Sequence, residues 1–302
     1  MIYKKNKLEF DGFKINYLAK KFNTPLYCYS SKKISKNILN LQKNFKKINP
    51  LICYAVKANS NINILKEIKK FNLGADVVSL GELMKAIKAG INPKKIVFSG
   101  VGKTSEEIEY AINKKILLIN AESESEIKQI EKIAKLKNRK VQVGIRLNPN
   151  TDAKTLSQIS TGKKENKFGV NDKTFFQLVN YCKNSKIIDL KCLSVHIGSQ
   201  IQDHKPYEKM LKSITKILNK INYKFEFIDL GGGMGITYKS GEKKLNYKRY
   251  HLAIKKFLNN FNSKIIFEPG RSIIGNTGTL ISQITYIKKS EQKNFIILDA
   301  AM

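Results

Sequence analysis

One lysine of this chain stands apart because it follows an apolar segment. Residues 51–58 read Leu-Ile-Cys-Tyr-Ala-Val-Lys-Ala, which is typical of a buried strand that ends near Lys57. No other charged residue lies between Pro50 and Lys66. Desolvation lowers the pKa of a lysine, and the neutral amine is a nucleophile that can form a Schiff base with a carbonyl compound. We therefore expect Lys57 to be a catalytic residue rather than a solvated surface charge.

Other polar residues and glycines lie at or near the ends of predicted strands. They are Asp76, Arg146, His196, Ser199, Gly231, Gly232, Gly233, Glu268, Gly270 and Arg271. In a barrel of parallel strands, the carboxyl ends of all strands share one face. We therefore expect these residues to meet Lys57 in one site.

Three consecutive glycines follow the predicted strand that ends at Leu230. Their backbone N–H groups can converge on an anion, and barrels often bind phosphate after their seventh and eighth strands. The dinucleotide-binding pattern GxGxxG is absent, because Ile236 stands where it requires glycine. The alternative is a flexible turn that binds nothing.

His196 and the segment Glu268-Pro-Gly-Arg271 supply the remaining chemistry. His196 ends an apolar strand, three residues before Ser199, where its flat ring can pack on a planar ligand; the alternative is a satisfied core histidine. Pro269 and Gly270 form a tight turn that presents a carboxylate and a guanidinium in different directions. An arginine at this position suits a carboxylate or a phosphate.

A lysine amine, a phosphate cradle, a flat stacking partner and a carboxylate are the groups that pyridoxal 5′-phosphate requires. Hydrolysis by a serine and histidine pair is the weaker alternative, because the chain has no GxSxG motif. The three histidines form no HExxH or similar pair, so no metal site is predicted.

Regular alternation of strand and helix patterns must position these groups. The predicted strands are Leu51–Ala58, Gly74–Ser79, Lys95–Gly100, Ile116–Ala121, Lys140–Asn148, Leu190–Ile197, Phe225–Leu230 and Lys264–Glu268. Helical patterns lie between them, at Asn63–Phe71, Gly81–Ala89, Ser105–Lys114, Ser123–Lys137, Lys173–Cys182, Tyr207–Asn219 and Tyr247–Phe261. Eight such units predict an α/β fold, a (β/α)8 TIM barrel, in preference to a doubly wound open sheet.

The segments outside the barrel predict a second, incomplete all-β domain. We divide the chain into an N-terminal segment 1–30 that partly belongs to the β domain, a barrel 31–268, and the start of the β domain at 269–302. A helix is predicted near Ile15–Phe22, a strand at Thr24–Ser30 and a helix at Ser31–Ile48, whereas 272–287 and 295–299 are strand-like without intervening helices. Two or three strands cannot form an independent domain, so we expect a chain that is C-terminally truncated at Met302. The polar segment Pro149–Gly169, which contains Thr161-Gly-Lys-Lys164, is predicted to be an active-site loop.

The composition favours a soluble cytoplasmic protein over a nucleic-acid binder. The formal net charge is +32, but only four of the 56 basic residues are arginine. Surfaces that bind nucleic acid usually recruit arginine, whereas here lysine is spread through nearly every predicted helix. The four cysteines show no CxxC spacing, no signal peptide precedes them, and no apolar run approaches the ~20 residues needed to span a bilayer.

Six ordered segments resemble the motifs of fold-type III pyridoxal-phosphate decarboxylases, whose barrel is alanine-racemase-like. The segments are Tyr54–Ser60, Gly74–Ser79, Lys167–Val170, His196–Ile201, Asp229–Gly233 and Glu268–Arg271. The resemblance covers the whole chain. The form His-Ile-Gly-Ser-Gln is typical of family members that act on diaminopimelate, whereas members that act on ornithine usually carry a different residue after the serine. A relative that acts on ornithine, arginine or carboxynorspermidine is the alternative. A barrel that binds the cofactor without catalysis is a further alternative.

The resemblance implies a role for each residue. Lys57 would carry pyridoxal 5′-phosphate, His196 would stack on its ring, and Glu268 would pair with its pyridine nitrogen. Ser199, the three glycines and Arg271 would surround phosphate and substrate, with Arg271 also reaching a substrate carboxylate. The implied reaction removes CO2 from meso-2,6-diaminoheptanedioate at its D centre and gives L-lysine, the last step of lysine biosynthesis. Members of the family continue past the position of Met302, and a Cys-Glu segment and a tyrosine from that region complete the site across a homodimer interface. We therefore expect little turnover by residues 1–302 alone.

Overall fold

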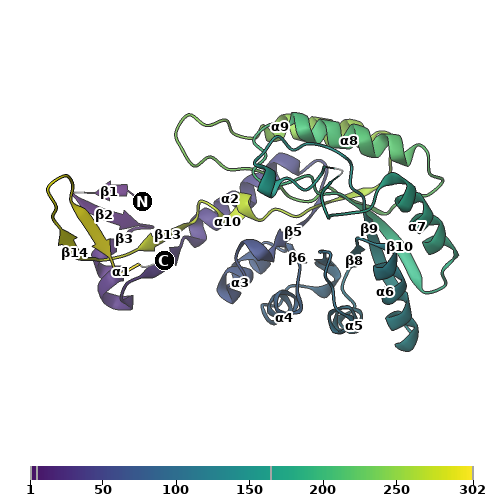
Figure 1. Cartoon of the computed structure of the whole chain (residues 1–302), viewed down its shortest axis with the longest axis horizontal. Coiled ribbons are helices and arrows are strands. Elements are labelled where there is room, and N and C mark those ends of the chain that lie inside the picture. Colours follow the sequence, from purple (N-terminus) through teal and green to yellow (C-terminus); the bar gives the residue numbers. More distant parts are fainter. Residues whose placement is uncertain (1, 5, 164, 301–302) are drawn as a thin grey trace.

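A closed barrel of eight parallel strands forms the centre of the molecule (Figure 1). The structure is a computed structural model that describes residues 2–4, 6–163 and 165–300. The strands close in sequence order, with β12 pairing with β5. They are β5 (Leu51–Ala55), β6 (Gly74–Val77), β7 (Ile96–Phe98), β8 (Leu118–Ala121), β9 (Val141–Arg146), β10 (Ile188–Ser194), β11 (Phe227–Asp229) and β12 (Lys264–Phe267). The predicted barrel is confirmed.

Amphipathic helices surround the barrel and bury one face each against it. They are α2 (Ser31–Phe45), α3 (Ile62–Lys70), α4 (Leu80–Lys88), α5 (Ser105–Lys114), α6 (Glu124–Leu136), α7 (Asp172–Asn184), α8 (Lys205–Leu218) and α9 (Tyr247–Leu258). Seven of these helices begin after a Ser, Thr or Asn whose side chain accepts a hydrogen bond from the first turn. These caps satisfy backbone donors that the helix leaves free, which explains why the starts were predictable within two residues.

Two apolar layers hold the barrel. The larger layer lies between strands and helices, and includes Phe45, Tyr54, Leu65 and Phe267, all fully buried. The smaller layer fills the barrel interior with side chains from six strands, namely Cys53, Val97, Leu118, Cys192, Phe227 and Ile266. The interior is therefore a packed core, and the polar groups are confined to the end where the strands finish.

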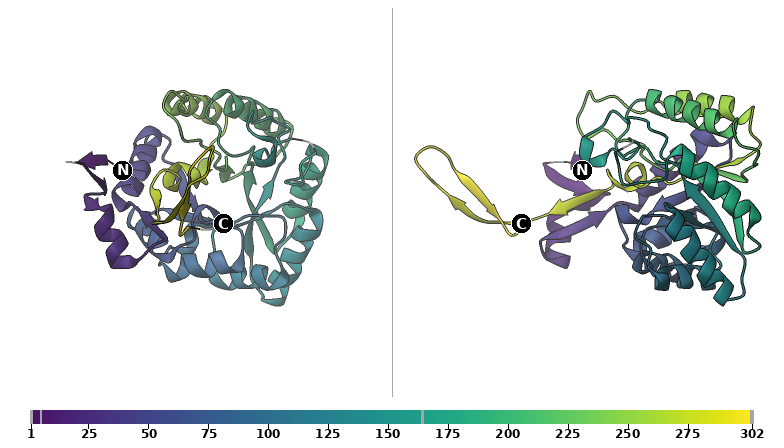
Figure 2. Two further views of the ribbon diagram at one scale, coloured as in Figure 1. Left: turned by 60° about the vertical axis from the view of Figure 1, so that its left-hand side comes forward. Right: turned by 45° about the vertical axis from the view of Figure 1, so that its right-hand side comes forward.

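The N-terminal segment and residues 278–281 lie beside one another outside the barrel (Figures 1 and 2). β1 (Ile2–Lys4), β2 (Lys7–Phe10) and β3 (Phe13–Lys14) form an antiparallel sheet, followed by α1 (Ile15–Phe22) and β4 (Leu26–Tyr29). β4 pairs antiparallel with β13 (Gly278–Ile281). The division into 1–30, 31–268 and 269–302 remains a prediction, and Met1, Lys5, Ala301 and Met302 lie outside the described residues.

One part of the sequence reading of the last segment was wrong. Residues 271–274 form a short helix, α10 (Arg271–Ile274), where only strands were expected. Gly270 allows this because a Cβ there would lie 3.0 Å from Ala58 and 3.1 Å from Ala55, so the chain turns tightly against the end of β5. β14 (Ile284–Lys288) and β15 (Phe295–Leu298) then form a hairpin that extends away from the rest of the molecule (Figure 2).

Within the part of the chain that is described, no helix has both the length and the apolar character needed to cross a bilayer.

Candidate functional site

A cavity of about 350 Å3 lies where the barrel strands end. It brings together seven of the predicted residues, Lys57, His196, Ser199, Gly233, Glu268, Gly270 and Arg271. The other four, Asp76, Arg146, Gly231 and Gly232, do not line the cavity. Asp76 and Arg146 are buried and ion-paired nearby, and the two glycines lie in the turn behind His196. The expected convergence at one end of the barrel is therefore present.

Lys57 lies in a 3-10 turn, Val56–Ala58, directly after β5 rather than at the end of the strand itself. Its Nζ is 3.4 Å from Oδ2 of Asp76, which is fully buried, while the Lys57 side chain is 54% exposed. The negative charge of Asp76 raises the pKa of Lys57 more than desolvation lowers it. Desolvation therefore does not decide the pKa of Lys57, because the strand beside β5 supplies a buried carboxylate.

Asp76 has a second oxygen that is not satisfied by the protein. Its Oδ1 is buried and has no hydrogen-bond partner among the described residues. An unpaired buried carboxylate oxygen is costly. Its position beside Lys57 marks this end of the cavity as a place for a donor that the protein itself does not provide.

His196 is neutral and its orientation is fixed. Burial and the positive charges of Arg146 and Lys57 hold the pKa of His196 well below its usual range. Its Nδ1 accepts a hydrogen bond from the backbone N–H of Gly232 at 3.2 Å, so the proton of the neutral ring is on Nε2. The ring is thus held from behind, at the wall of the cavity.

The segment 149–169 packs against this wall. Thr161 donates from Oγ1 to the carbonyl of His196 at 3.0 Å, and the N–H of Ser199 donates to the carbonyl of Ile159 at 2.9 Å. The segment therefore contacts the site, as an active-site loop would. Lys164, which the prediction included, lies outside the described residues.

The glycine turn differs from the predicted anion cradle. The N–H of Gly231 donates to Oδ1 of Asp229 at 2.9 Å, and the N–H of Gly232 to His196. Two of the three predicted donors are therefore engaged within the protein. The glycines are needed for another reason: a Cβ on Gly232 would lie 2.1 Å from the carbonyl oxygen of Glu268, and one on Gly233 2.3 Å from that of Gly198.

Arg271 is oriented by Ser199 and by Tyr238, a residue that the sequence reading missed. The guanidinium donates from Nε to Ser199 Oγ at 3.4 Å and from Nη1 to the hydroxyl of Tyr238. Tyr238 lies in an extended loop, and its backbone is held through Ile236, whose N–H and carbonyl both bond the side-chain amide of Gln200. No local pattern marks Tyr238, because only these contacts between distant segments bring it to the cavity.

Two buried acids lie together at the cavity, of which one lines it and the other lies behind. Glu268 follows β12, and Asp229 ends the neighbouring strand β11; their side chains are hydrogen-bonded to one another. Burial raises the pKa of Asp229 to about 6 and that of Glu268 well above its ordinary value. The negative charge of Asp229 raises the pKa of Glu268 further, whereas the hydrogen bond with Glu268 lowers the pKa of Asp229. Asp229 was not predicted as a site residue, although a carboxylate in the apolar run Phe225–Leu230 was a visible signal.

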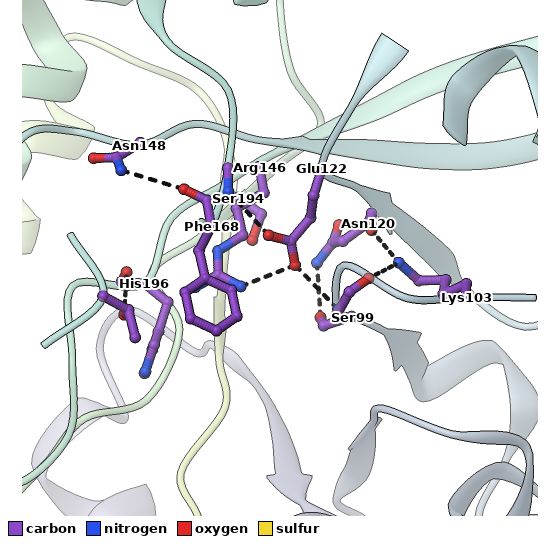
Figure 3. A network of polar contacts seen from close by, with 12 residues as sticks. Ser99, Lys103, Asn120, Glu122, Arg146, Asn148, Phe168, Ser194 and His196 are labelled. Carbon is purple, nitrogen blue, oxygen red and sulfur yellow. Dashed lines mark hydrogen bonds and ion pairs between the residues drawn. The ribbon is translucent and has the colours of Figure 1, made fainter. Parts of the chain in front are cut away.

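Arg146 belongs to a buried polar network beside these acids (Figure 3). Its Nη1 is 3.0 Å from Oε1 of Glu122, and its guanidinium lies 4.8 Å from the ring centre of Phe168. Glu122 also accepts the N–H groups of Gly100 at 3.1 Å and Gly169 at 2.9 Å. The network thus links the ends of β7, β8 and β9 to the start of α7, and Glu122 is a third residue missed from the sequence, after Tyr238 and Asp229.

Fold and site together define a (β/α)8-barrel protein that presents one lysine amine, an oriented arginine and buried carboxylates to a small polar ligand. Lysine amines of this kind bond to carbonyl groups, and arginine binds carboxylate or phosphate.

Comparisons with known proteins agree with this class. The family described as "Pyridoxal-dependent decarboxylase, pyridoxal binding domain" matches residues 31–275. A diaminopimelate decarboxylase of Helicobacter pylori is 43% identical over 293 residues, covering 96% of this chain and 72% of that protein. The enzyme of that name from Aquifex aeolicus is 39% identical over 303 residues, covering 99% of this chain and 72% of that protein. The crystal structure of the Helicobacter pylori enzyme complexed with L-lysine superposes with a TM-score of 0.90 at 43% identity, covering 94% of this chain and 72% of that one. This chain therefore belongs to the pyridoxal-dependent decarboxylases.

Proposed function

We propose that this chain acts in the decarboxylation of meso-2,6-diaminoheptanedioate at its D centre, which gives L-lysine and CO2 and completes lysine biosynthesis. Pyridoxal 5′-phosphate is its cofactor. The observation that carries the proposal is the meeting of Lys57, His196, Glu268 and Arg271 around one cavity in a chain of this family. Relatives at 39–43% identity bear the name diaminopimelate decarboxylase.

The residues of the cavity suit the cofactor. The Lys57 amine is open to the cavity and would bond the aldehyde, while Asp76 keeps an unpaired oxygen beside it. His196 offers a neutral ring as a flat wall, and Glu268 would face the pyridine nitrogen. Ser199, Gly270 and Gly233, which line the cavity, would surround the phosphate, with Arg271 between phosphate and substrate. Gly231 and Gly232 would hold the turn behind them, since their N–H groups bond Asp229 and His196. Arg146 would act through the buried network behind the ring.

When bound, pyridoxal 5′-phosphate withdraws electrons from the α carbon of an amino acid, which stabilises the carbanion that remains when CO2 departs. The chain's own groups make this possible. With the cofactor bound, Glu268 would hold a negative charge at the nitrogen end of the cavity, and Asp76 keeps the Lys57 amine in place at the other end. The contacts of Thr161 and Ser199 hold the segment 149–169 over His196, which limits the access of water to that wall.

Arg271 is the residue that we assign to a substrate carboxylate. Its Nη1 bonds Tyr238 and its Nε bonds Ser199, so its remaining donors have a fixed direction. A fixed guanidinium favours a substrate with a carboxylate far from the reacting carbon, as diaminopimelate has and ornithine and arginine lack. We further propose that the protein acts in the cytoplasm as a homodimer.

Absorbance spectroscopy tests the cofactor site directly. The chain mixed with pyridoxal 5′-phosphate should show the visible band of a lysine-bound cofactor, and borohydride reduction should fix the cofactor on the peptide that contains Lys57. Lys57→Ala should abolish both signals. Lys85→Ala is the matched control, since Lys85 is an exposed lysine of α4 that bonds Ser60 nearby. A band that survives in Lys57→Ala would overturn the assignment, and CO2 release from diaminopimelate compared with ornithine and arginine tests the substrate.

A further inference from the structure

Asp229 and Glu268 are two buried acids whose hydrogen-bond partners are divided unequally. Asp229 accepts three hydrogen bonds from other groups, from Gly231 N at 2.9 Å, Asn120 Nδ2 at 3.1 Å and Ser194 Oγ at 3.2 Å. Glu268 receives one long contact, from Ser99 Oγ at 3.4 Å. Three donors suit an ionised carboxylate. Asp229 is therefore the member of the pair that bears the negative charge, and Glu268 is the member that holds the proton and donates it to Asp229.

Groups from every neighbouring element act on this pair. Asp76 of β6 adds negative charge and raises the pKa of both acids, whereas Lys57 lowers that of Glu268. The buried thiols of Cys53 and Cys192 and the hydroxyl of Tyr250 face the pair as well, and burial keeps all three neutral at ordinary pH because it raises their pKa values. His196 is neutral and Arg146 is paired with Glu122. Burial and the charge of Asp229 raise the pKa of Glu268 well above its ordinary value, and the three donors to Asp229 favour its ionised form, so the pair shares one proton.

We propose that Asp229 is a positioning residue that keeps Glu268 protonated in the cofactor-free protein, and that this proton leaves Glu268 when the pyridine nitrogen of the cofactor docks against it. The inference rests on the proposed function and adds to it the release of one proton when the cofactor binds. The O–H bond of Glu268 breaks, and the proton passes to the pyridine nitrogen if that nitrogen arrives unprotonated, or to water if it arrives protonated. No electron is transferred, and Glu268 and Asp229 both end as carboxylates, with the positive ring facing Glu268.

Calorimetry of cofactor binding counts this proton without any measurement of activity. The chain is titrated with pyridoxal 5′-phosphate at pH 7 in two buffers that differ in ionisation enthalpy, and the difference in heat gives the protons exchanged with solvent. Asp229→Asn removes the negative charge that, after burial itself, contributes most to the raised pKa of Glu268, so the variant brings less of this proton to the binding event. We expect the wild type to release more protons per cofactor bound than Asp229→Asn does, by up to about one. Asp189→Asn, a half-buried carboxylate on β10 that pairs with Lys191, is the control and should match the wild type.

The outcomes of this experiment distinguish a failure of the proton inference from a failure of the proposed function. Equal proton counts in the wild type and Asp229→Asn, with cofactor bound by both, would overturn this inference and leave the proposed function intact. A wild-type chain that binds no cofactor would overturn both. If Asp229→Asn does not fold, Glu268→Gln serves in its place, because it keeps Asp229 with its three donors and removes the proton itself. It should show the same loss of about one proton, and an unchanged count would refute the proposal equally.

Discussion

Replacing Gly232 by alanine should separate the two strand ends that carry the site. A Cβ on Gly232 would lie 2.1 Å from the carbonyl oxygen of Glu268, whereas ordinary contacts begin at 3.4 Å, so the backbones must move apart by more than 1 Å. The hydrogen bond from Glu268 N to the carbonyl of Gly231, 2.8 Å long, lies in the same place and would be lost. The loss of one hydrogen bond costs about 1 kcal/mol and the overpacking about 1–3 kcal/mol. We therefore expect Gly232→Ala to lower the free energy of unfolding by roughly 2–4 kcal/mol.

Thermal unfolding measures this loss as a fall in Tm of roughly 4–8 °C, since about 1 kcal/mol shifts Tm by roughly 2 °C in a chain of this size. Affinity for the cofactor should fall as well, because Glu268 moves. Gly81→Ala is the matched control: Gly81 lies in α4, a Cβ there would meet nothing within 4 Å, and alanine should stabilise the helix by about 0.5–1 kcal/mol. A Gly232→Ala protein with the Tm and cofactor affinity of the wild type would refute the argument that this glycine is required by the contact with Glu268.

Three further substitutions test the charge of Asp229, the buried ion pair of Glu122 and the orientation of Arg271. The folded-state pKa of Asp229 lies above its ordinary value of 3.8, so its burial costs about 3 kcal/mol at neutral pH. Asp229→Asn should therefore stabilise the cofactor-free chain at pH 7, and urea unfolding should show this gain disappearing as the pH falls toward 4. Glu122→Gln leaves its arginine partner buried without a counter-charge and should cost about 3–5 kcal/mol in the same assay; a loss below 1 kcal/mol would contradict the network. Tyr238→Phe should weaken cofactor binding about 2- to 10-fold, because it removes the hydrogen bond that orients Arg271. Its Tm should change little, since Tyr238 is 59% exposed. The control Tyr27→Phe should leave both cofactor affinity and Tm unchanged.

The barrel was predictable because local and global signals agree in it. Each strand reads as an apolar run and each helix as an amphipathic pattern with a capping residue, so every element was placed within a few residues. The first strand is instructive, since Val56–Ala58 continues the apolar run but turns into a 3-10 helix. Periodicity cannot distinguish the two, because the turn is set by the close approach of Gly270 to Ala55 and Ala58. The same approach explains why the short helix α10 was not expected.

The candidate site was predictable only where chemistry coincides with the end of a strand. Lys57, Glu268 and Arg271 follow strands directly, and the topology carries them to one cavity. Tyr238 reaches the cavity through the bonds between Gln200 and Ile236, which join segments that no sequence pattern connects. The sign of the shift in the pKa of Lys57 could not be predicted for the same reason, since it depends on Asp76 of the neighbouring strand and not on the residues beside Lys57.

The charges of the site explain how one barrel end can hold a lysine that must react and acids that must stay in place. Asp76 pairs with Lys57 across 3.4 Å and holds the amine at one side of the cavity. Asp229 and Glu268 would add two more negative charges to the same buried space, and there the pair retains a proton because Lys57 does not compensate both. A ligand with a positively charged ring nitrogen allows both acids to ionise, since its charge replaces that of the proton. The raised pKa values of the two acids are therefore a property of the cofactor-free chain, and the binding of the cofactor is the event that should relieve them.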